Sequence, residues 1–220
     1  MEDCDAWLKF PQHHNWFNKL WVADLFGYTC GPAGTDIPKS DTYVVRPTYN
    51  LGGMGARANV VQLNKGDYSS VPPGYFWCEY FNGNHYSVNY TWKMNHLTGG
   101  SWEGTTCWQG VNMPINLTKF VEWKRSNYIP TLPIKGKLNE LHDVGEINVE
   151  FIEDKIIEVH LRKSPDPEYD HMVPVWESDE MFRVGNQRKE HYELHGYKWI
   201  ESYDDANGYI DDPRIGFFVR

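Results

Sequence analysis

The stretch that most constrains the fold of this chain is a predicted hairpin at residues 145–162. Alternating apolar residues predict two short strands, Ile147–Ile152 and Lys155–Leu161, joined by an acidic turn. Because side chains of a strand alternate between its two faces, antiparallel pairing would bring Glu150 close to Glu158. The hairpin therefore predicts an antiparallel sheet with two carboxylates on one face.

That face carries an unusual set of side chains. Glu158, His160 and Arg162 share this face, and the apolar residues that alternate with them, beginning with Ile157, point to the opposite face. Two carboxylates about 4 Å apart repel by about 4 kcal/mol at an effective dielectric of about 20, so a face that carries them needs a cation. Hard oxygen ligands beside phosphates suit Mg²⁺. A solvated hairpin with ordinary surface charges explains the same residues, and this segment alone leaves both interpretations open.

A second stretch, residues 42–61, has the pattern strand, glycine-rich loop, strand. Its glycines have no Cβ, so backbone N–H groups can approach a phosphate closely. Arg46 and Arg57 bracket the loop and can add charge-assisted hydrogen bonds. The loop is not a Walker A motif, which needs Gly-Lys-Ser/Thr opening a helix. A tight hairpin turn explains the glycines equally well, but the acidic hairpin farther along the chain favours a nucleotide site.

These stretches resemble the ATP-grasp enzymes, and most closely the ATP-grasp domain of the carbamoyl phosphate synthetases. Val45-Arg-Pro-Thr-Tyr-Asn-Leu-Gly-Gly is similar to the glycine-rich loop of that family. Asn148-Val-Glu-Phe and Ile157-Glu-Val-His-Leu-Arg resemble its two metal strands, and Tyr75-Phe-Trp-Cys-Glu-Tyr-Phe-Asn-Gly-Asn-His resembles its adenine hinge. Four motifs in the family's order cover roughly residues 40–165.

The resemblance implies an α+β fold, the ATP-grasp fold, with two lobes of mostly antiparallel sheet plus helices and ATP between them. We expect residues 1–74 to form the small lobe with the glycine-rich loop. Residues 75–220 would form the large lobe with the adenine hinge and the metal hairpin. The implied activity is that of an ATP-dependent carboxylate–amine ligase that proceeds through an acyl phosphate. It would use ATP, Mg²⁺ or Mn²⁺, and an unidentified carboxylate and amine.

The resemblance also gives roles to individual residues. The metal ligands would be Glu150, Glu158 and His160. Arg46 and Arg162 would be catalytic, Arg46 by holding the phosphates and Arg162 by steadying the transferred phosphoryl group. The residues at ATP-binding positions are Lys19, Arg46, Gly52, Gly53, Gly55, Arg57, Glu79, Phe81 and His85. A lysine on an exposed helix face is commonly just solvated, which is the other interpretation of Lys19.

Three features depart from the family pattern. His160 stands where the family has an asparagine ligand, and imidazole suits Mn²⁺ better than Mg²⁺. His85 replaces a glutamate that holds the ribose, and almost nothing precedes the core where the family carries another domain. These departures favour an alternative, a nucleotide-binding module without catalysis or a subunit that acts with a partner protein or as a homo-oligomer. A second alternative is an assembly protein unrelated to nucleotides.

Composition narrows the classes further. A chain of 220 residues can form one two-lobed domain, and a net charge of −9 argues against broad nucleic-acid or anionic-membrane binding. No apolar run approaches the ~20 residues of a membrane span, and the acidic N-terminus lacks a signal region. The four cysteines show no C-x-x-C spacing, so we expect reduced thiols in a cytoplasmic protein.

The remaining segments give expectations for local structure. Helical spacing of aromatic residues predicts one helix over residues 12–27. The hinge strand Tyr75–Phe81 would form a hairpin with a strand at His85–Lys93. Near the C-terminus, Tyr197–Tyr203 and Ile215–Val219 predict two strands around a turn.

The middle of the chain is less regular. Its glycines indicate a loop-rich insertion at residues 94–115, in which Trp102 and Trp108 anchor the loop or line a substrate pocket. The spacing of Phe120 and Trp123 predicts a short amphipathic helix at Asn116–Asn127.

Overall fold

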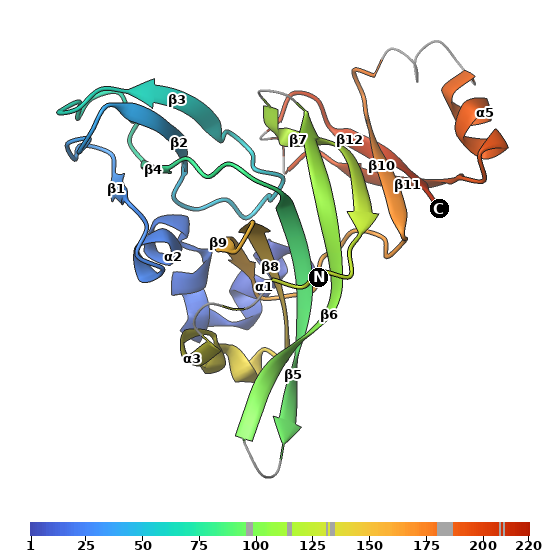
Figure 1. Cartoon of the computed structure of the whole chain (residues 1–220), viewed down its shortest axis with the longest axis horizontal. Helices are drawn as coiled ribbons and strands as arrows, with labels where there is room; N and C mark the ends of the chain where they lie inside the picture. Colours follow the sequence, from blue (N-terminus) through green and yellow to red (C-terminus); the bar gives the residue numbers. More distant parts are fainter. Residues whose placement is uncertain are drawn as a thin grey trace.

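The computed structural model describes residues 1–95, 99–113, 116–130, 132, 135–179, 187–206, 208 and 210–220. Its strands form one sheet of four strands and one of eight, and the paired strands run antiparallel throughout. The predicted α+β class with mostly antiparallel sheets is confirmed. Figure 1 shows the four-stranded sheet at the upper left and the larger sheet crossing the middle of the molecule.

The four-stranded sheet has the order β1-β4-β2-β3. Its strands are β1 (Cys30–Pro32), β2 (Asp41–Pro47), β3 (Asn59–Leu63) and β4 (Tyr75–Glu79). Tyr43, Val45 and Trp77 form the centre of a small core on one face of this sheet. The glycine-rich loop joins β2 to β3, so this sheet carries the loop at one end.

The eight-stranded sheet has the order β11-β12-β10-β7-β6-β5-β8-β9. Its strands are β5 (His85–Asn95), β6 (Gly99–Met113), β7 (Asn116–Arg125), β8 (Glu146–Ile152), β9 (Lys155–His160), β10 (His171–Trp176), β11 (Lys198–Asp204) and β12 (Arg214–Val219). The predicted metal hairpin is β8–β9, at one end of the sheet, and the two predicted C-terminal strands are β11 and β12. Both predictions of strands are confirmed.

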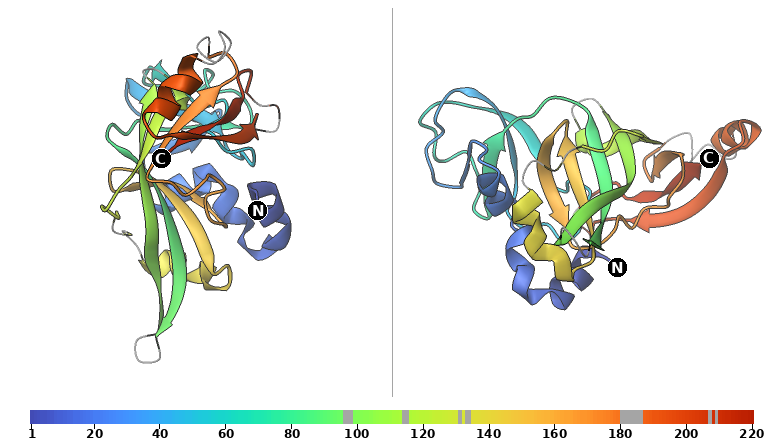
Figure 2. Two further views of the ribbon diagram at one scale, coloured as in Figure 1. Left: turned by 90° about the vertical axis from the view of Figure 1, so that its right-hand side faces the viewer. Right: turned by 60° about the horizontal axis from the view of Figure 1, so that its bottom comes forward.

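The N-terminal helices cover the open edge of β9. They are α1 (Asp3–Lys9), the 3₁₀ helix η1 (Pro11–Phe17) and α2 (Lys19–Leu25). Their apolar residues join those of β5, β8 and β9 in the largest core of the molecule. In Figure 2 they lie beside the yellow and orange strands β8 and β9. An edge strand exposes unpaired backbone groups, and a cover of helices protects it.

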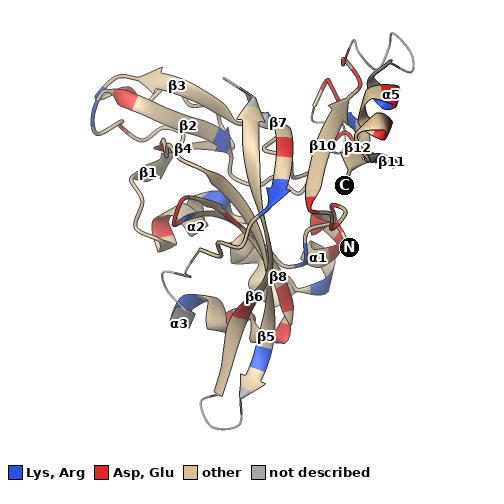
Figure 3. Cartoon of the chain, turned by 45° about the vertical axis from the view of Figure 1, so that its right-hand side comes forward, with Lys and Arg blue, Asp and Glu red and all other residues tan. Residues whose placement is uncertain are grey.

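The described residues contain three other helical segments. They are α3 (Lys135–Leu138), the 3₁₀ helix η2 (Asn139–Asp143) and α5 (Gln187–Leu194). Among the described residues no helix is long and apolar enough to span a membrane. All four cysteines are free thiols. Figure 3 shows no described helix or strand that is basic along its whole length.

The single helix predicted over residues 12–27 is wrong in one respect, because it is interrupted at Asn18. The backbone of Asn18 is extended, and its side-chain Oδ1 accepts a hydrogen bond of 2.9 Å from the N–H of Trp21. An asparagine in this position caps the helix that follows it. The chain therefore forms η1 and α2 with a turn between them, which places Lys19 at the first position of α2.

The predicted hairpin between the hinge strand and the strand at His85–Lys93 is also wrong. The hinge strand β4 pairs with β1 and β2, whereas β5 pairs with β6 and β8 in the other sheet. The chain crosses between the sheets over residues 80–84. Helices α1 and η1 pack in the core of the eight-stranded sheet, whereas α2 also packs against Phe76 and Cys78 of β4 in the small sheet.

The loop-rich insertion and the helix predicted for residues 94–127 are replaced by strands where the structure describes them. The glycines lie in β6, and a Cβ on Gly110 would be 2.7 Å from ring atoms of both Phe120 and Trp123. On β7 a register shift leaves Val121 as an extra residue, so Phe120 and Trp123 share a face although they are three positions apart. A β-bulge thus imitates helical spacing. Residues 96–98 and 114–115 lie outside the described part.

Candidate functional site

The hairpin β8–β9 places two carboxylates side by side, as its pattern predicts. Glu150 lies opposite Glu158, and Asn148 lies opposite His160. Val149 and its alternate neighbours face the core on the other side. A register shift after Glu150 turns Ile156 into the core in place of Ile157. The expected pairing is therefore confirmed, whereas the expected placement of Ile157 in the apolar face is wrong.

Glu158 is buried and shares one of its oxygens with two cations. Its Oε1 forms an ion pair with Lys19 Nζ and lies 3.2 Å from Nη1 of Arg46. Arg46 Nη2 also donates to the backbone oxygen of Ile157 at 3.0 Å. Burial alone would raise the pKa of Glu158, but the charge of Lys19 and the hydrogen bond from His160 outweigh burial and lower the pKa to about 2. Glu158 is therefore ionised at neutral pH.

His160 connects the carboxylates of this cluster. Its Nδ1 lies 2.8 Å from Oδ2 of Asp3, and its Nε2 lies 3.4 Å from Oε2 of Glu158 and 3.8 Å from Oε1 of Glu150. Burial would lower the pKa of His160, but Asp3 and the two glutamates raise it well above its usual value. The other oxygen of Asp3 lies 2.9 Å from Nε of Arg162. Asp3 thereby holds both His160 and Arg162 in place.

The cluster is nearly balanced in charge by its own side chains. Glu158 is paired with Lys19 and Arg46, Asp3 with His160 and Arg162, and Glu150 with His85 and His160. Buried charges need such partners, because an unpaired charge away from water is costly. Arg46 retains a buried Nε that makes no hydrogen bond to the described residues.

The ligand atoms of this cluster fit a small divalent cation. Glu150, Glu158 and His160 each offer one atom, and these atoms lie within 4.8 Å of one another. Carboxylate oxygens suit Mg²⁺ and Mn²⁺, and the imidazole nitrogen favours Mn²⁺. The geometry leaves Oε2 of Glu158 facing His160, because Lys19 and Arg46 bind Oε1.

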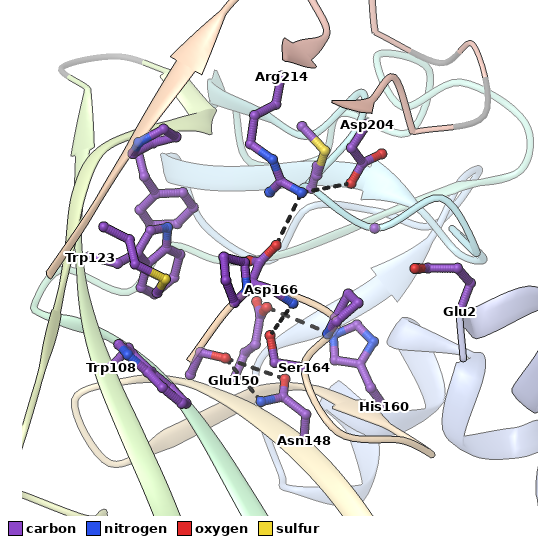
Figure 4. Close-up of a pocket in the computed structure, with 18 of the residues that line it drawn as sticks. Glu2, Trp108, Trp123, Asn148, Glu150, His160, Ser164, Asp166, Asp204 and Arg214 are labelled. Atoms are coloured by element: carbon purple, nitrogen blue, oxygen red, sulfur yellow. Dashed lines mark hydrogen bonds and ion pairs between the residues drawn. The ribbon is translucent and has the colours of Figure 1, made fainter. Parts of the chain in front are cut away.

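A cleft that is partly open to solvent lies beside this cluster. Glu150, His160 and Arg162 line it together with Gly52 and Gly53 of the glycine-rich loop. Figure 4 shows Glu150 near the middle of the cleft, His160 and Glu2 on one side, and Trp108 and Trp123 on the other. The glycine-rich loop and the acidic hairpin, which are far apart in the sequence, therefore meet at one cavity.

The glycine-rich loop is held by its own residues and by the segment that follows β11. The side chain of Asn50 accepts from the N–H of Gly52 at 3.1 Å and donates to the oxygen of Gly53 at 2.8 Å. A Cβ on Gly52 would be 2.5 Å from the backbone oxygen of Ala206. The absence of a side chain at Gly52 is therefore required for the C-terminal segment to close over the loop.

Gly52→Ala is expected to lower the free energy of unfolding by about 1–3 kcal/mol, because a methyl group at this position overlaps a backbone carbonyl that has to move. Gly136→Ala in α3 is the matched control, since a Cβ there meets nothing within 4 Å. Denaturant unfolding of both variants measures the difference. Equal stability of the two variants would contradict the close approach of Gly52 to Ala206.

The other residues at the expected ATP-binding positions lie in different places. Gly55 and Arg57 follow in the same loop, but neither they nor Glu79 and Phe81 line this cleft. Glu79 accepts a hydrogen bond of 2.9 Å from the N–H of Thr29, and the ring of Phe81 packs against Tyr28 at 4.8 Å. In the structure, Glu79 is thus a hydrogen-bond acceptor for the segment before β1, and Phe81 packs against an aromatic ring of the same segment.

His85 lies close to the cluster of Glu150, Glu158 and His160. Its Nε2 is 3.3 Å from Oε2 of Glu150. Its ring stands edge-on to the rings of Phe120 and Trp123, with centroids 5.0 and 5.6 Å away. Burial would raise the pKa of Glu150, but hydrogen bonds to His160 and His85 lower it well below its usual value. His85 therefore connects Glu150 to an aromatic wall.

Asp3 is the functional residue that sequence reasoning missed. It belongs to the acidic N-terminal segment, which carries no family motif. One signal was present, because Asp3, Ala6 and Phe10 have helical spacing and all three are buried. A charged residue on the buried face of a helix requires a buried partner, and such a position is a candidate for a site.

Comparisons with known proteins find similarity among solved structures. No family model matches the chain, and no curated protein matches it. Among solved structures, a putative ATP-grasp superfamily protein from Archaeoglobus fulgidus is 14% identical with a TM-score of 0.36, covering 68% of this chain and 46% of that chain. An L-amino acid ligase from Bacillus licheniformis is 11% identical with a TM-score of 0.42, covering 69% of this chain and 42% of that chain.

The chain thus spans less than half the length of these two structures. Both TM-scores are below 0.5.

Proposed function

We propose that the chain binds ATP with a divalent cation between the glycine-rich loop and the β8–β9 hairpin, and that it activates a carboxylate for ligation to an amine. The observation that supports this proposal most strongly is the convergence of Glu150, Glu158 and His160 with the cations Lys19 and Arg46. The glycine-rich loop lines the same cleft as Glu150 and His160. Phosphoryl transfer needs this combination of negative ligands and positive groups.

The metal would be held by Glu150 and Glu158, and by Nε2 of His160 once that nitrogen has released its proton to solvent. A divalent cation bound there would neutralise the charge that develops on the phosphates during transfer. Mn²⁺ suits the imidazole ligand, and Mg²⁺ suits the two carboxylates. The compact cluster and the ionised state of both glutamates support this assignment.

Lys19 and Arg46 would be shared between Glu158 and the phosphates. Both already contact Oε1 of Glu158, and Nε of Arg46 is a buried donor without a partner in the described residues. Charge-assisted hydrogen bonds from these groups would orient the γ-phosphate toward the attacking carboxylate. Arg162, held by Asp3, would stabilise the negative charge of the acyl phosphate before the amine displaces the phosphate.

One observation favours a second candidate, a nucleotide-binding module without catalysis. Glu158 is already compensated by Lys19 and Arg46, and Asp3 by Arg162, so these side chains can persist as a buried network that only supports the fold. Release of phosphate from Mg²⁺-ATP in the presence of mixed carboxylic acids and amines distinguishes the two. Release that depends on both an acid and an amine supports the ligase, whereas nucleotide binding without release supports the module.

His160→Asn is expected to shift the metal preference from Mn²⁺ toward Mg²⁺, because it replaces a nitrogen ligand with an amide oxygen. The measurement is the ATP affinity with each metal in the wild type and in the variant. His142→Asn provides a control, since His142 is an exposed residue of η2 away from the cluster. An unchanged Mn²⁺/Mg²⁺ ratio in His160→Asn would remove His160 from the metal site.

A further inference from the structure

The far side of the cleft is an apolar wall that the phosphate chemistry does not use. It is built from three strands, β6, β7 and β10. The residues that line it are Trp108, Phe120, Trp123, Met172, Pro174 and Trp176. In Figure 4, Trp108 and Trp123 lie across the cleft from His160, with Glu150 between the two sides. A molecule that reacts beside Glu150 would therefore extend along this wall.

The wall is held rigidly before any ligand binds. The indole N–H of Trp108 donates to the backbone oxygen of Tyr169 at 2.8 Å. The rings of Phe120 and Trp123 have centroids 4.2 Å apart, and both lie against Gly110, where a Cβ would be 2.7 Å from each. Preformed apolar pockets with a few polar groups at one end are typical small-molecule sites.

The charges around the wall disfavour an acidic ligand. Arg214, the described cation that lines this end, is held by Asp166 at 3.0 Å and by Asp204 at 3.6 Å. Lys119, close to the ring of Trp176, forms an ion pair with Asp212. A carboxylate side chain placed against the wall would lose its water and gain no free partner among these cations.

We propose that this wall is the side-chain subsite of the ligase, and that it takes a substrate with an apolar side chain of aromatic or branched aliphatic type. The reacting amine or carboxylate of that substrate would lie at the Glu150 end of the cleft. This inference rests on the proposed function for the reaction, but the subsite itself is defined by the aromatic residues. Burial of apolar atoms against the indoles provides the binding free energy.

The test uses the whole chain and two readouts. Calorimetry measures the binding of phenylalanine, leucine, aspartate and lysine without nucleotide, and phosphate release from Mg²⁺-ATP is measured with each of them. We expect phenylalanine and leucine to bind and aspartate not to bind. Phe120→Ala should weaken phenylalanine binding about tenfold, and Phe120→Leu should weaken it less. Val121→Ala is the matched control on the same strand, since Val121 is 44% exposed.

The outcomes separate the two claims. Phenylalanine binding that depends on Phe120, without any binding of ATP, would support the subsite and contradict the proposed ligase. ATP binding together with equal affinity for aspartate and phenylalanine would overturn the subsite and leave the nucleotide site standing. The subsite is also overturned if none of the four amino acids binds, or if Phe120→Ala and Phe120→Leu both bind phenylalanine as the wild type does.

Discussion

Glu158→Gln is expected to abolish ATP turnover and to lower the free energy of unfolding by about 3–5 kcal/mol. The stability loss follows because the substitution leaves Lys19 and Arg46 buried beside a neutral side chain, and removing one partner of a buried ion pair typically costs this much. The turnover loss follows because the candidate metal site loses one of its two carboxylates. Phosphate release and denaturant unfolding measure the two effects.

A double-mutant cycle with Lys19→Met separates the structural effect from the functional one. The double variant removes both charges of the pair. Its loss in the free energy of unfolding should therefore be smaller than the sum of the two single losses by at least about 1 kcal/mol. Turnover should stay lost in the double variant. The control is Glu146→Gln on the neighbouring strand β8, because the pair of Glu146 with Lys163 is exposed and contributes little. Restored turnover in the stable double variant would contradict a role of Glu158 beyond folding.

Asp3→Asn has the second large expected effect, a loss of about 3–5 kcal/mol in the free energy of unfolding at neutral pH. Asp3 is 2% exposed and is the shared counter-ion of His160 and Arg162. Without its charge, two buried cations lose their partner. Asp5→Asn on the same helix is the control, because Asp5 is exposed and accepts only the N–H of Glu2.

The loss caused by Asp3→Asn should vary with pH in a defined direction. The pKa of His160 is raised in the folded protein, so stabilisation by its charged form is complete below about 6.5 and is lost as the pH rises through the raised value. The pKa of Asp3 is lowered, so its contribution is present above about 3.9 and is lost as the pH falls through the lowered value.

The difference between wild type and Asp3→Asn should therefore be largest near pH 5–6 and should narrow at alkaline pH. Urea unfolding of both proteins at several pH values measures it. A difference that stays constant from pH 5 into the alkaline range would contradict the charged state of His160.

The acidic hairpin was predictable because a strand has a period of two residues, which fixes both the shared face of Glu150 and Glu158 and their pairing. The interrupted N-terminal helix and the bulged strand β7 were not. In β7 one extra residue, Val121, brings Phe120 and Trp123 to the same face and imitates helical spacing. Apolar residues three positions apart fit one face of a helix and also one face of a strand that contains a bulge. The local pattern alone does not distinguish the two.

The partners of the cluster were harder to predict than its ligands. Lys19 is positioned by the turn at Asn18, and Asp3 reaches His160 because the N-terminal helices wrap the edge of β9. Both contacts join residues that are far apart in the chain. Likewise, β4 and β5 follow each other in the sequence but enter different sheets, so pairing by proximity in sequence gave a hairpin that does not exist.

The central claim is that Glu150 and its neighbours bind a divalent cation with ATP, and calorimetric titration with a non-hydrolysable ATP analogue tests it most directly. The account predicts one site per chain, binding that requires Mg²⁺ or Mn²⁺, and loss of that binding in Glu150→Gln but not in Glu146→Gln. Absence of binding in the wild type with either metal, or an unchanged affinity in Glu150→Gln, would contradict it.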